Sequence, residues 1–168
     1  LHRLADVIAA REAGLADSIK TGRTHLMDAM PLSLAQELSG WRAQLVQAAQ
    51  RIDAGRAQLR QLAQGGTAVG TGVNADRQFA TRFCFYLSES CGQTFTPADN
   101  FFAALASQDV SVALSGQIKA LAVALLKIAN DLRWMNSGPL AGLGEITLKP
   151  LQPGSSIMPG KVNPVVPE

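Results

Sequence analysis

The chain has 168 residues, of which 47% are hydrophobic and 17% charged, a balance that excludes an intrinsically disordered protein and predicts one folded core. Its formal net charge is only +2 and its basic residues are scattered, which argues against nucleic acid as a partner but permits an anionic small molecule. Cys84 and Cys91 would lie two turns apart on a helix, too far to form a disulfide, which favours a reduced, cytoplasmic setting and two structural thiols.

Neither end of the sequence has the features of a natural terminus. Leu1–Lys20 contains no signal peptide or transit segment, and we expect His2 within it to lie on the surface. At the other end, Pro167 and Glu168 are typical of the first turn of a helix. We therefore expect residues 1–168 to be part of the central helical domain of a longer chain.

A long helix is predicted between Pro31 and Gly65. Its apolar residues recur at alternating spacings of three and four, which is the pattern of a helix that packs in a bundle. At about 30 residues it would be about 45 Å long, more than a small domain can cover. The stripe consists of Leu38, Trp41, Leu45, Ala48, Ile52, Leu59 and Leu62, with Gly55 in one position.

Two further helices are predicted, one over Asp76–Gly92 and one over Asp99–Asn130, the latter with Asp99 or Thr96 as its N-cap. Within the latter, Ile118–Ala129 is apolar except for two lysines. A stretch of about a dozen residues is too short to cross a bilayer, so we expect no membrane span but a helix buried on most sides. Such burial requires neighbours, which other subunits could supply.

After Asn130 the chain becomes rich in Gly, Pro and Ser and loses its helical period. Long ordered loops of this kind commonly carry function. The predicted fold class is therefore all-α, a bundle of long helices with an extended loop region near the C-terminus.

Three segments combine glycine and hydroxyl residues with a charge or a tight turn, namely Thr21–Pro31, Gly65–Gly72 and Gly154–Pro164. Such loops can surround an anion with N–H groups and hydroxyls. A nucleotide-binding module is the weakest interpretation, because Gly154 and Gly160 are separated by five residues where a P-loop has four, and Gly65–Gly72 lacks the dinucleotide spacing.

The last segment favours acid–base chemistry. Ser155 and Ser156 lie between glycines, and the nearby Lys161 would favour a serine alkoxide and bind a carboxylate, while Asn163 adds a directional donor. A surface turn rich in Gly, Pro and Ser is an equal alternative on composition alone. His25, expected just before a helix that Pro31 begins, is more often a capping or core residue than a catalyst.

These segments resemble those of class II fumarases in the fumarase/aspartase superfamily, and the match covers essentially the whole chain. The resemblance implies a central bundle of long helices in a homotetramer whose active sites each combine segments of three subunits. It also implies reversible anti addition of water to fumarate, giving (S)-malate, a tricarboxylic acid cycle reaction that needs no metal or organic cofactor. The matching segments are Thr21–Leu26 with Asp28 and Pro31, Gly65–Gly72, Lys127–Asp131, Ser137–Pro139, Gly142–Glu145 and Gly154–Pro164.

Residue by residue, the resemblance makes Ser155 the base that takes a proton from the carbon next to a carboxylate, with Ser156 beside it in the loop. It makes Lys161 and Asn163 the donors that meet the charge of the resulting aci-carboxylate. These assignments make the partner of this part of the site a small dicarboxylate.

The resemblance also makes Thr24 and His25 substrate contacts from another subunit, and Glu168 the carboxylate that hydrogen-bonds the histidine. A carboxylate partner would raise the histidine pKa and fix its tautomer. The identity of the general acid stays open. A further Ser- and Asn-rich segment of the family is absent, so we expect no turnover from these 168 residues alone.

Two positions depart from the fumarase pattern. Leu140 follows Ser-Gly-Pro where fumarases usually have arginine, and Val165-Val166 is closer to an aspartase. In contrast, aspartases tend to have glutamine at the position of His25, so a fumarate hydratase is favoured over an aspartate ammonia-lyase. A relative that kept the fold and lost its chemistry is the alternative of another class.

Overall fold

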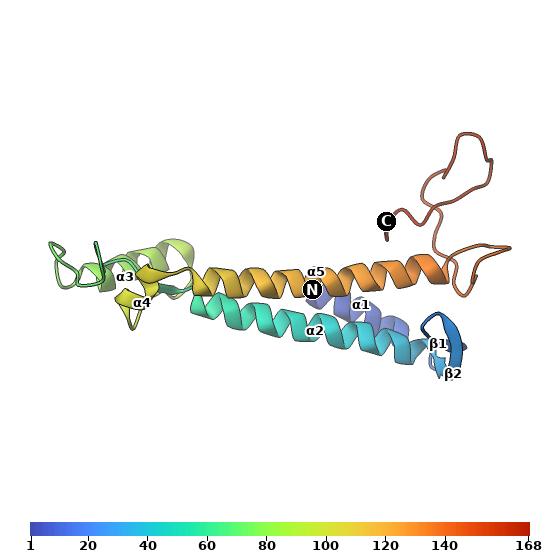
Figure 1. The fold of residues 1–168 in the computed structure, drawn as a ribbon, viewed down its shortest axis with the longest axis horizontal. Coiled ribbons are helices and arrows are strands. Elements are labelled where there is room, and N and C mark those ends of the chain that lie inside the picture. Colours follow the sequence, from blue (N-terminus) through green and yellow to red (C-terminus); the bar gives the residue numbers. More distant parts are fainter. The chain divides into compact units, whose positions relative to one another are not determined.

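A computed structural model describes residues 1–168 and places them in two compact units. The first unit comprises residues 1–47 and 120–168, and the second comprises residues 48–119. The long helices α2 (Leu34–Gln58) and α5 (Asp109–Met135), which are labelled in Figure 1, contribute residues to both units. The helix-rich fold agrees with the predicted all-α class.

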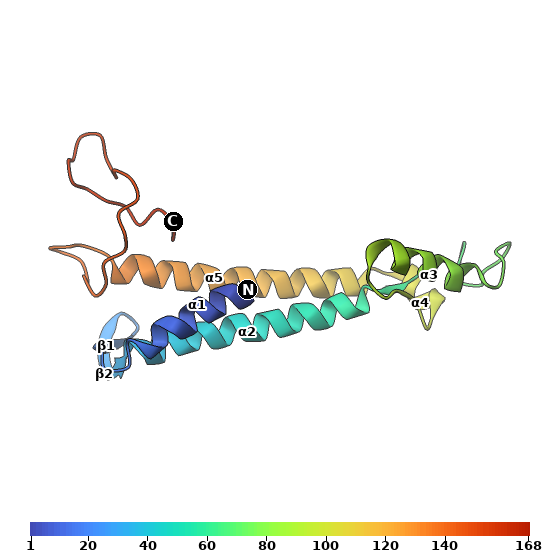
Figure 2. The same ribbon diagram turned by 180° about the vertical axis from the view of Figure 1, so that it is seen from behind.

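The core of the first unit lies where three helices meet, α1 (His2–Ala13), α2 and α5. Figure 2 shows α1 beside α2 in the view from behind. Because Trp41 and Leu45 occupy successive positions of the predicted stripe, they face the same side and pack on Ile8 of α1 and Ile128 and Met135 of α5. His2 is exposed, which confirms its predicted position on the surface.

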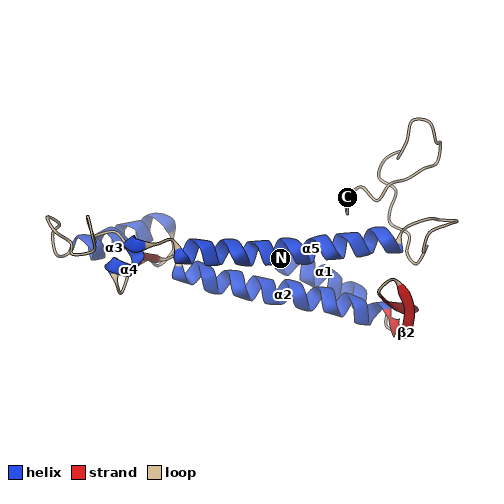
Figure 3. Cartoon of the chain, in the orientation of Figure 1, coloured by secondary structure: helices blue, strands red, loops and turns tan.

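The first unit also contains an antiparallel hairpin of β1 (Ile19–Thr24) and β2 (Met27–Ser33), which Figure 3 shows in red at one end of α2. The expectation that Pro31 begins a helix is therefore wrong. Pro31 lies in β2 opposite Thr21, where its missing N–H is tolerated because both strands of a lone hairpin are edges.

The helix α2 begins instead after Ser33, at a capping box. The Ser33 Oγ accepts a hydrogen bond from the Gln36 N–H at 3.2 Å, and the Gln36 Oε1 accepts one from the Ser33 N–H at 2.9 Å. The predicted stripe is buried or half-buried from Leu38 to Gly55, but α2 ends at Gln58, and Leu62 lies in a short strand.

The second unit contains α3 (Phe79–Cys91), α4 (Phe101–Ala106) and two short parallel strands, β3 (Gln61–Leu62) and β4 (Thr96–Pro97). The end of α3 is confirmed at Gly92, which has a φ of 62° that glycine adopts readily. Both cysteines lie on α3 and are free, Cys84 buried and Cys91 exposed.

The predicted helix over Asp99–Asn130 is two helices. Ser107 has an extended backbone (φ −152°) that separates α4 from α5, and α5 then continues to Met135. The N-cap is neither Asp99 nor Thr96 but Asn100, whose Oδ1 accepts a hydrogen bond from the Ala103 N–H at 3.1 Å.

The helix α5 also departs from the expectation that it is buried on most sides, because only Ile128 and Met135 are buried within a single chain. Its apolar stretch is longer than the dozen residues expected. It is the one helix long and apolar enough to cross a membrane, and 18 consecutive residues of it have a mean hydropathy of 1.6, although the core helix of a bundle has the same composition. Its exposed large apolar residues are Val112, Ile118, Val123, Leu125, Leu126 and Trp134.

Candidate active site

Thr24 and His25 lie at the tip of the β1–β2 hairpin. Thr24 pairs with Met27, so only His25 and Leu26 form the turn. Both have positive φ angles, 52° and 64°, as a type I′ turn requires. This left-handed conformation costs a residue with a side chain roughly 1 kcal/mol or more. The hairpin thus holds an exposed histidine on a strained turn.

Gly22 allows the hairpin to bulge below this tip, where the strand register shifts between Thr21 and Arg23. A Cβ atom at Gly22 would lie 2.4 Å from the Met30 carbonyl oxygen, so no other residue fits. Two β2 residues, Ala29 and Met30, lie opposite Gly22 alone, so the extra residue of the bulge is on β2. Here Lys20 and Arg23 both reach one carboxylate.

That carboxylate is Glu145, which belongs to the loop after α5. Its Oε1 lies 2.7 Å from an Arg23 guanidinium nitrogen, and its Oε2 lies 2.9 Å from the Lys20 Nζ. The same Lys20 Nζ lies 2.6 Å from the Glu37 Oε2 in the first turn of α2. The Lys20 and Glu145 side chains are only 10% and 13% exposed. We call Lys20, Arg23, Glu37 and Glu145 the charge network.

The charge network keeps its buried members ionised. Burial alone would lower the Lys20 pKa, but the contacts with Glu37 and Glu145 outweigh it and raise that pKa. Burial would likewise raise the Glu145 pKa, but Arg23 and Lys20 together lower it. Two cations and two carboxylates therefore balance each other in a poorly solvated place.

The Gly154–Pro164 segment forms a closed loop. The Gly154 N–H donates a hydrogen bond to the Lys161 carbonyl oxygen at 2.7 Å, and Pro153 and Val162 form an antiparallel bridge. A Cβ atom at Gly154 would lie 2.9 Å from that oxygen and 2.7 Å from the Asn163 Oδ1. Glycine therefore lets the two ends of the loop meet.

Ser155 lies just inside this closure, and its Oγ accepts hydrogen bonds from the backbone N–H groups of Ile157 and Met158, both at 3.3 Å. Two N–H donors aimed at one oxygen stabilise negative charge on it. The side chain is half-buried and the neighbouring Ser156 is exposed. The loop therefore holds the Ser155 hydroxyl oxygen against two backbone N–H donors.

Lys161 and Asn163 stand at the other end of the loop. Lys161 is exposed and takes part in none of the ion pairs of the chain, so its ammonium group is free to bind an anion. Asn163 is half-buried against Gly154. Thus one loop holds Ser155, Ser156, Lys161 and Asn163 together.

Glu168 lies beyond the loop, where its N–H donates a hydrogen bond to the Pro164 carbonyl oxygen at 3.2 Å. Its side chain helps to line a cavity with Asn130 and Arg133 at the end of α5, whereas His25 lines another cavity beside the hairpin. A single chain therefore does not pair Glu168 with His25.

The cavity beside the hairpin, of about 950 Å³, is bordered by Thr24 and His25. The cations on its wall are already engaged, Lys20 and Arg23 by the charge network and Lys127 by Asp131. It shares no lining residue with the Gly154–Pro164 loop. The structure thus presents two groups of predicted site residues, one on the hairpin and one on the loop.

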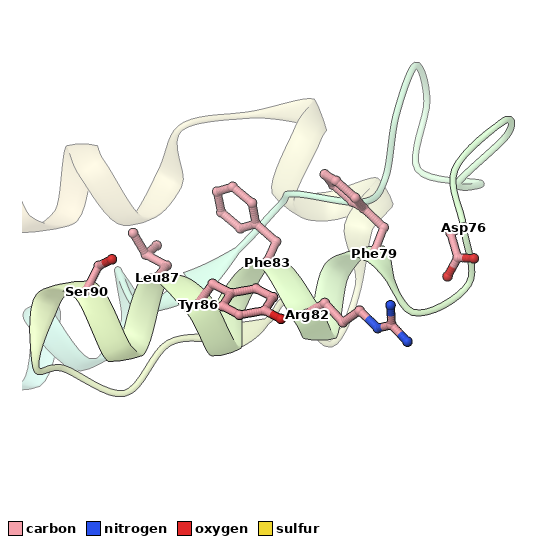
Figure 4. Close-up of a pocket in the computed structure, with 7 residues that line it drawn as sticks. All are labelled: Asp76, Phe79, Arg82, Phe83, Tyr86, Leu87 and Ser90. Carbon is pink, nitrogen blue, oxygen red and sulfur yellow. The ribbon is translucent and has the colours of Figure 1, made fainter.

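A groove on α3 contains none of the predicted residues. Figure 4 shows Phe79, Phe83 and Tyr86 beside it. The neighbouring Gly65–Gly72 segment has a packing role, because a Cβ atom at Gly65 would lie 2.7 Å from the Ala80 Cβ and one at Gly70 would lie 2.8 Å from the Phe102 ring. These glycines thus allow close contact with α3 and α4.

Sequence reasoning missed the charge network. Two of its members, Arg23 and Glu145, lie inside matched segments, but neither had an assigned partner. The bulge opposite Gly22 has no signature beyond a glycine within a short strand.

The family model described as lyase matches residues 1–168, and the chain belongs to this family. The resemblance to class II fumarases is confirmed by its curated relatives. The chain is 60% identical over 168 residues to fumarate hydratase class II 2 of Pseudomonas aeruginosa and 59% identical to fumarate hydratase class II of Xylella fastidiosa.

Solved structures agree with this assignment. The crystal structure of recombinant class II fumarase from Schistosoma mansoni superposes with a TM-score of 0.94 at 40% identity, covering 99% of this chain and 38% of that one. The two bacterial relatives are covered over 37% and 36% of their length, and this chain over 100%. The chain thus spans little more than a third of the proteins it matches.

Proposed function

We propose that residues 1–168 are part of the central helical domain of a longer polypeptide, here called the full-length polypeptide, which interconverts fumarate and (S)-malate. The first half of this proposal is supported by the two bacterial relatives, because the chain matches only 37% and 36% of their length. The observation that carries the second half is the Ser155 Oγ, which accepts two backbone N–H donors in the same closed loop as the unpaired Lys161.

In the direction of malate dehydration, Lys161 and Asn163 bind one substrate carboxylate. The Ser155 alkoxide removes a proton from the substrate carbon bonded to this carboxylate. The electrons of the C–H bond then move into the carboxylate and form an aci-carboxylate. The N–H groups of Ile157 and Met158 stabilise the alkoxide before this transfer, and Lys161 stabilises the charge after it.

The elimination then returns the electrons to form the carbon–carbon double bond, while the bond to the hydroxyl group on the adjacent carbon breaks. Hydroxide takes a proton from a general acid and leaves as water, so atoms and charge balance. Thr24 and His25 would contact the substrate from the hairpin of another subunit, with Glu168 as the partner of His25. The identity of the acid stays open between His25 and another group.

We also propose a homotetramer, working in the cytoplasm, as the assembly that completes the site. The exposed apolar residues of α5 support it, because a large unpartnered apolar face is unfavourable in water. The separation of the hairpin residues from the serine loop in one chain agrees with a site shared between subunits.

An aspartate ammonia-lyase is the second candidate. Leu140, which is 98% exposed after Ser-Gly-Pro, leaves no arginine at that position, and Val165-Val166 follows the loop. The deciding experiment supplies the full-length polypeptide with (S)-malate or aspartate and follows fumarate by its ultraviolet absorbance. Fumarate from malate supports the hydratase, whereas fumarate and ammonia from aspartate alone would assign the ammonia-lyase.

A structural relative without catalysis is the candidate of another class. It predicts that neither substrate yields fumarate, although the full-length polypeptide folds and assembles. The intact set of Ser155, Lys161, Asn163 and His25 argues against it.

A further inference from the structure

All the ion pairs between the rest of the chain and the hairpin that carries Thr24 and His25 belong to the charge network. Its tip residues are exposed, and its turn is built from two side-chain-bearing residues in the left-handed region. A turn of this kind has no intrinsic preference for its conformation, so the surrounding structure must impose it. The orientation of His25 therefore depends on what fixes the strands below.

Glu145 is well placed to do so, because its own backbone is anchored to the core. The N–H groups of Glu145 and Ile146 both donate to the Met135 carbonyl oxygen, at 2.8 and 3.2 Å. Met135 is buried in the core of the first unit, and Ile146 packs against that core. The carboxylate of Glu145 thus projects from a fixed point.

From this point Glu145 reaches β1 at two positions. One carboxylate oxygen contacts Arg23, which directly precedes Thr24. The other contacts Lys20, which lies before the bulge in the sequence. Lys20 in turn joins the strand to Glu37 in the first turn of α2. The bulge at Gly22 therefore lies between two anchored residues.

We propose that Glu145 is a positioning residue, which acts through Arg23 and Lys20 to set the place of Thr24 and His25 at the hairpin tip. Glu145 touches no predicted site residue itself. Its catalytic importance rests on the proposed function, whereas its effect on the hairpin does not. The lowered pKa of Glu145 and the raised pKa of Lys20 agree with an anchor that is ionised near neutral pH.

The test compares Glu145→Gln with Glu12→Gln in the full-length polypeptide. Glu12 is a matched control because its side chain is 16% exposed and its Oε1 lies 2.7 Å from the Arg42 Nε, away from the hairpin. Hydrogen–deuterium exchange of residues 19–33 reports the hairpin directly, and fumarate hydration kinetics report the site. Glu145→Asp tests whether restoring the charge restores part of the effect.

We expect Glu145→Gln to speed exchange in residues 19–33 and to lower kcat/KM about tenfold or more, since small misplacements of a site residue are costly. Glu145→Asp should recover part of both changes, and Glu12→Gln should show neither. Equal exchange and equal kinetics in Glu145→Gln and Glu12→Gln would overturn the proposal.

The test still gives an answer if the Glu145→Gln variant does not fold or if the unmodified protein does not hydrate fumarate. If Glu145→Gln does not fold, Arg23→Lys takes its place, because it keeps the charge but loses the guanidinium contact, and the same local loosening is expected. If the unmodified protein does not hydrate fumarate, the proposed function fails, and the exchange comparison alone then decides for or against positioning of the hairpin.

Discussion

The Glu145 carboxylate lies 2.7 Å from the guanidinium of Arg23, the residue that precedes Thr24 at the hairpin tip. This contact joins the loop after α5 to the hairpin within one chain. It couples two segments that are distant in sequence, and it makes part of the stability of the first unit dependent on ionisation.

The stability of the first unit should therefore fall in acid. The pKa of Glu145 is lowered from its ordinary value of 4.5, so its contribution is present above 4.5 and is lost as the pH falls through the folded-state value. Urea unfolding across this range should show a Glu145→Gln deficit that is largest at neutral pH and shrinks in acid. A deficit independent of pH would contradict this assignment.

The opposite dependence holds for Lys20. Its pKa is raised from 10.5, so the stability it contributes is complete below 10.5 and is lost as the pH rises through the folded-state value. Replacing Lys20 with methionine should reduce the loss of unfolding free energy in strong alkali, as followed by circular dichroism. An equal loss of unfolding free energy at alkaline pH in both proteins would show that deprotonation of Lys20 does not cause it.

The turn at the hairpin tip should improve when Leu26 is replaced by glycine. Leu26 has a φ of 64°, which glycine adopts without penalty. We expect Leu26→Gly to raise the free energy of unfolding by roughly 0.5–1 kcal/mol. Ala29→Gly lies at the bulge of β2, where the backbone φ is not positive, so it is the control and should lower the free energy of unfolding. Chemical denaturation measures both, and equal effects would disprove the strain.

The closure of the serine loop should not tolerate a side chain at Gly154. A Cβ atom there would lie 2.9 Å from the Lys161 carbonyl oxygen and 3.0 Å from the Asn163 backbone nitrogen, which are backbone atoms that cannot move aside cheaply. Gly154→Ala should reduce fumarate hydration by the full-length polypeptide at least tenfold with its helical content unchanged. The control Gly14→Ala meets only one atom, at 3.8 Å, and should be active.

The sequence predicted those parts of the fold that depend on repeated local pattern. The stripe through Trp41 and Leu45 predicted α2, and Gly92 predicted the end of α3, because periodicity and a C-terminal glycine are local signals. The hairpin was missed because its strands contain Gly22, Pro31 and several charges, which lack a strand pattern. The break at Ser107 was missed because nothing in its residue type requires an extended backbone.

The candidate site was predicted as a set of residues but not as a geometry. The sequence places Ser155 near Lys161, but it cannot specify that the N–H groups of Ile157 and Met158 turn toward the serine oxygen. Nor can it specify that Glu145 reaches β1, because burial of a charged residue depends on partners brought together only by folding.

The central claim is that Ser155 initiates a reversible hydration of fumarate. Its most direct test is the rate of fumarate hydration by the full-length polypeptide and by its Ser155→Ala variant, after circular dichroism and the native mass establish that both fold and assemble alike. The proposal predicts activity in the unmodified protein and a loss of about 100-fold or more in kcat for the variant. An unchanged rate in a well-folded Ser155→Ala protein would contradict it.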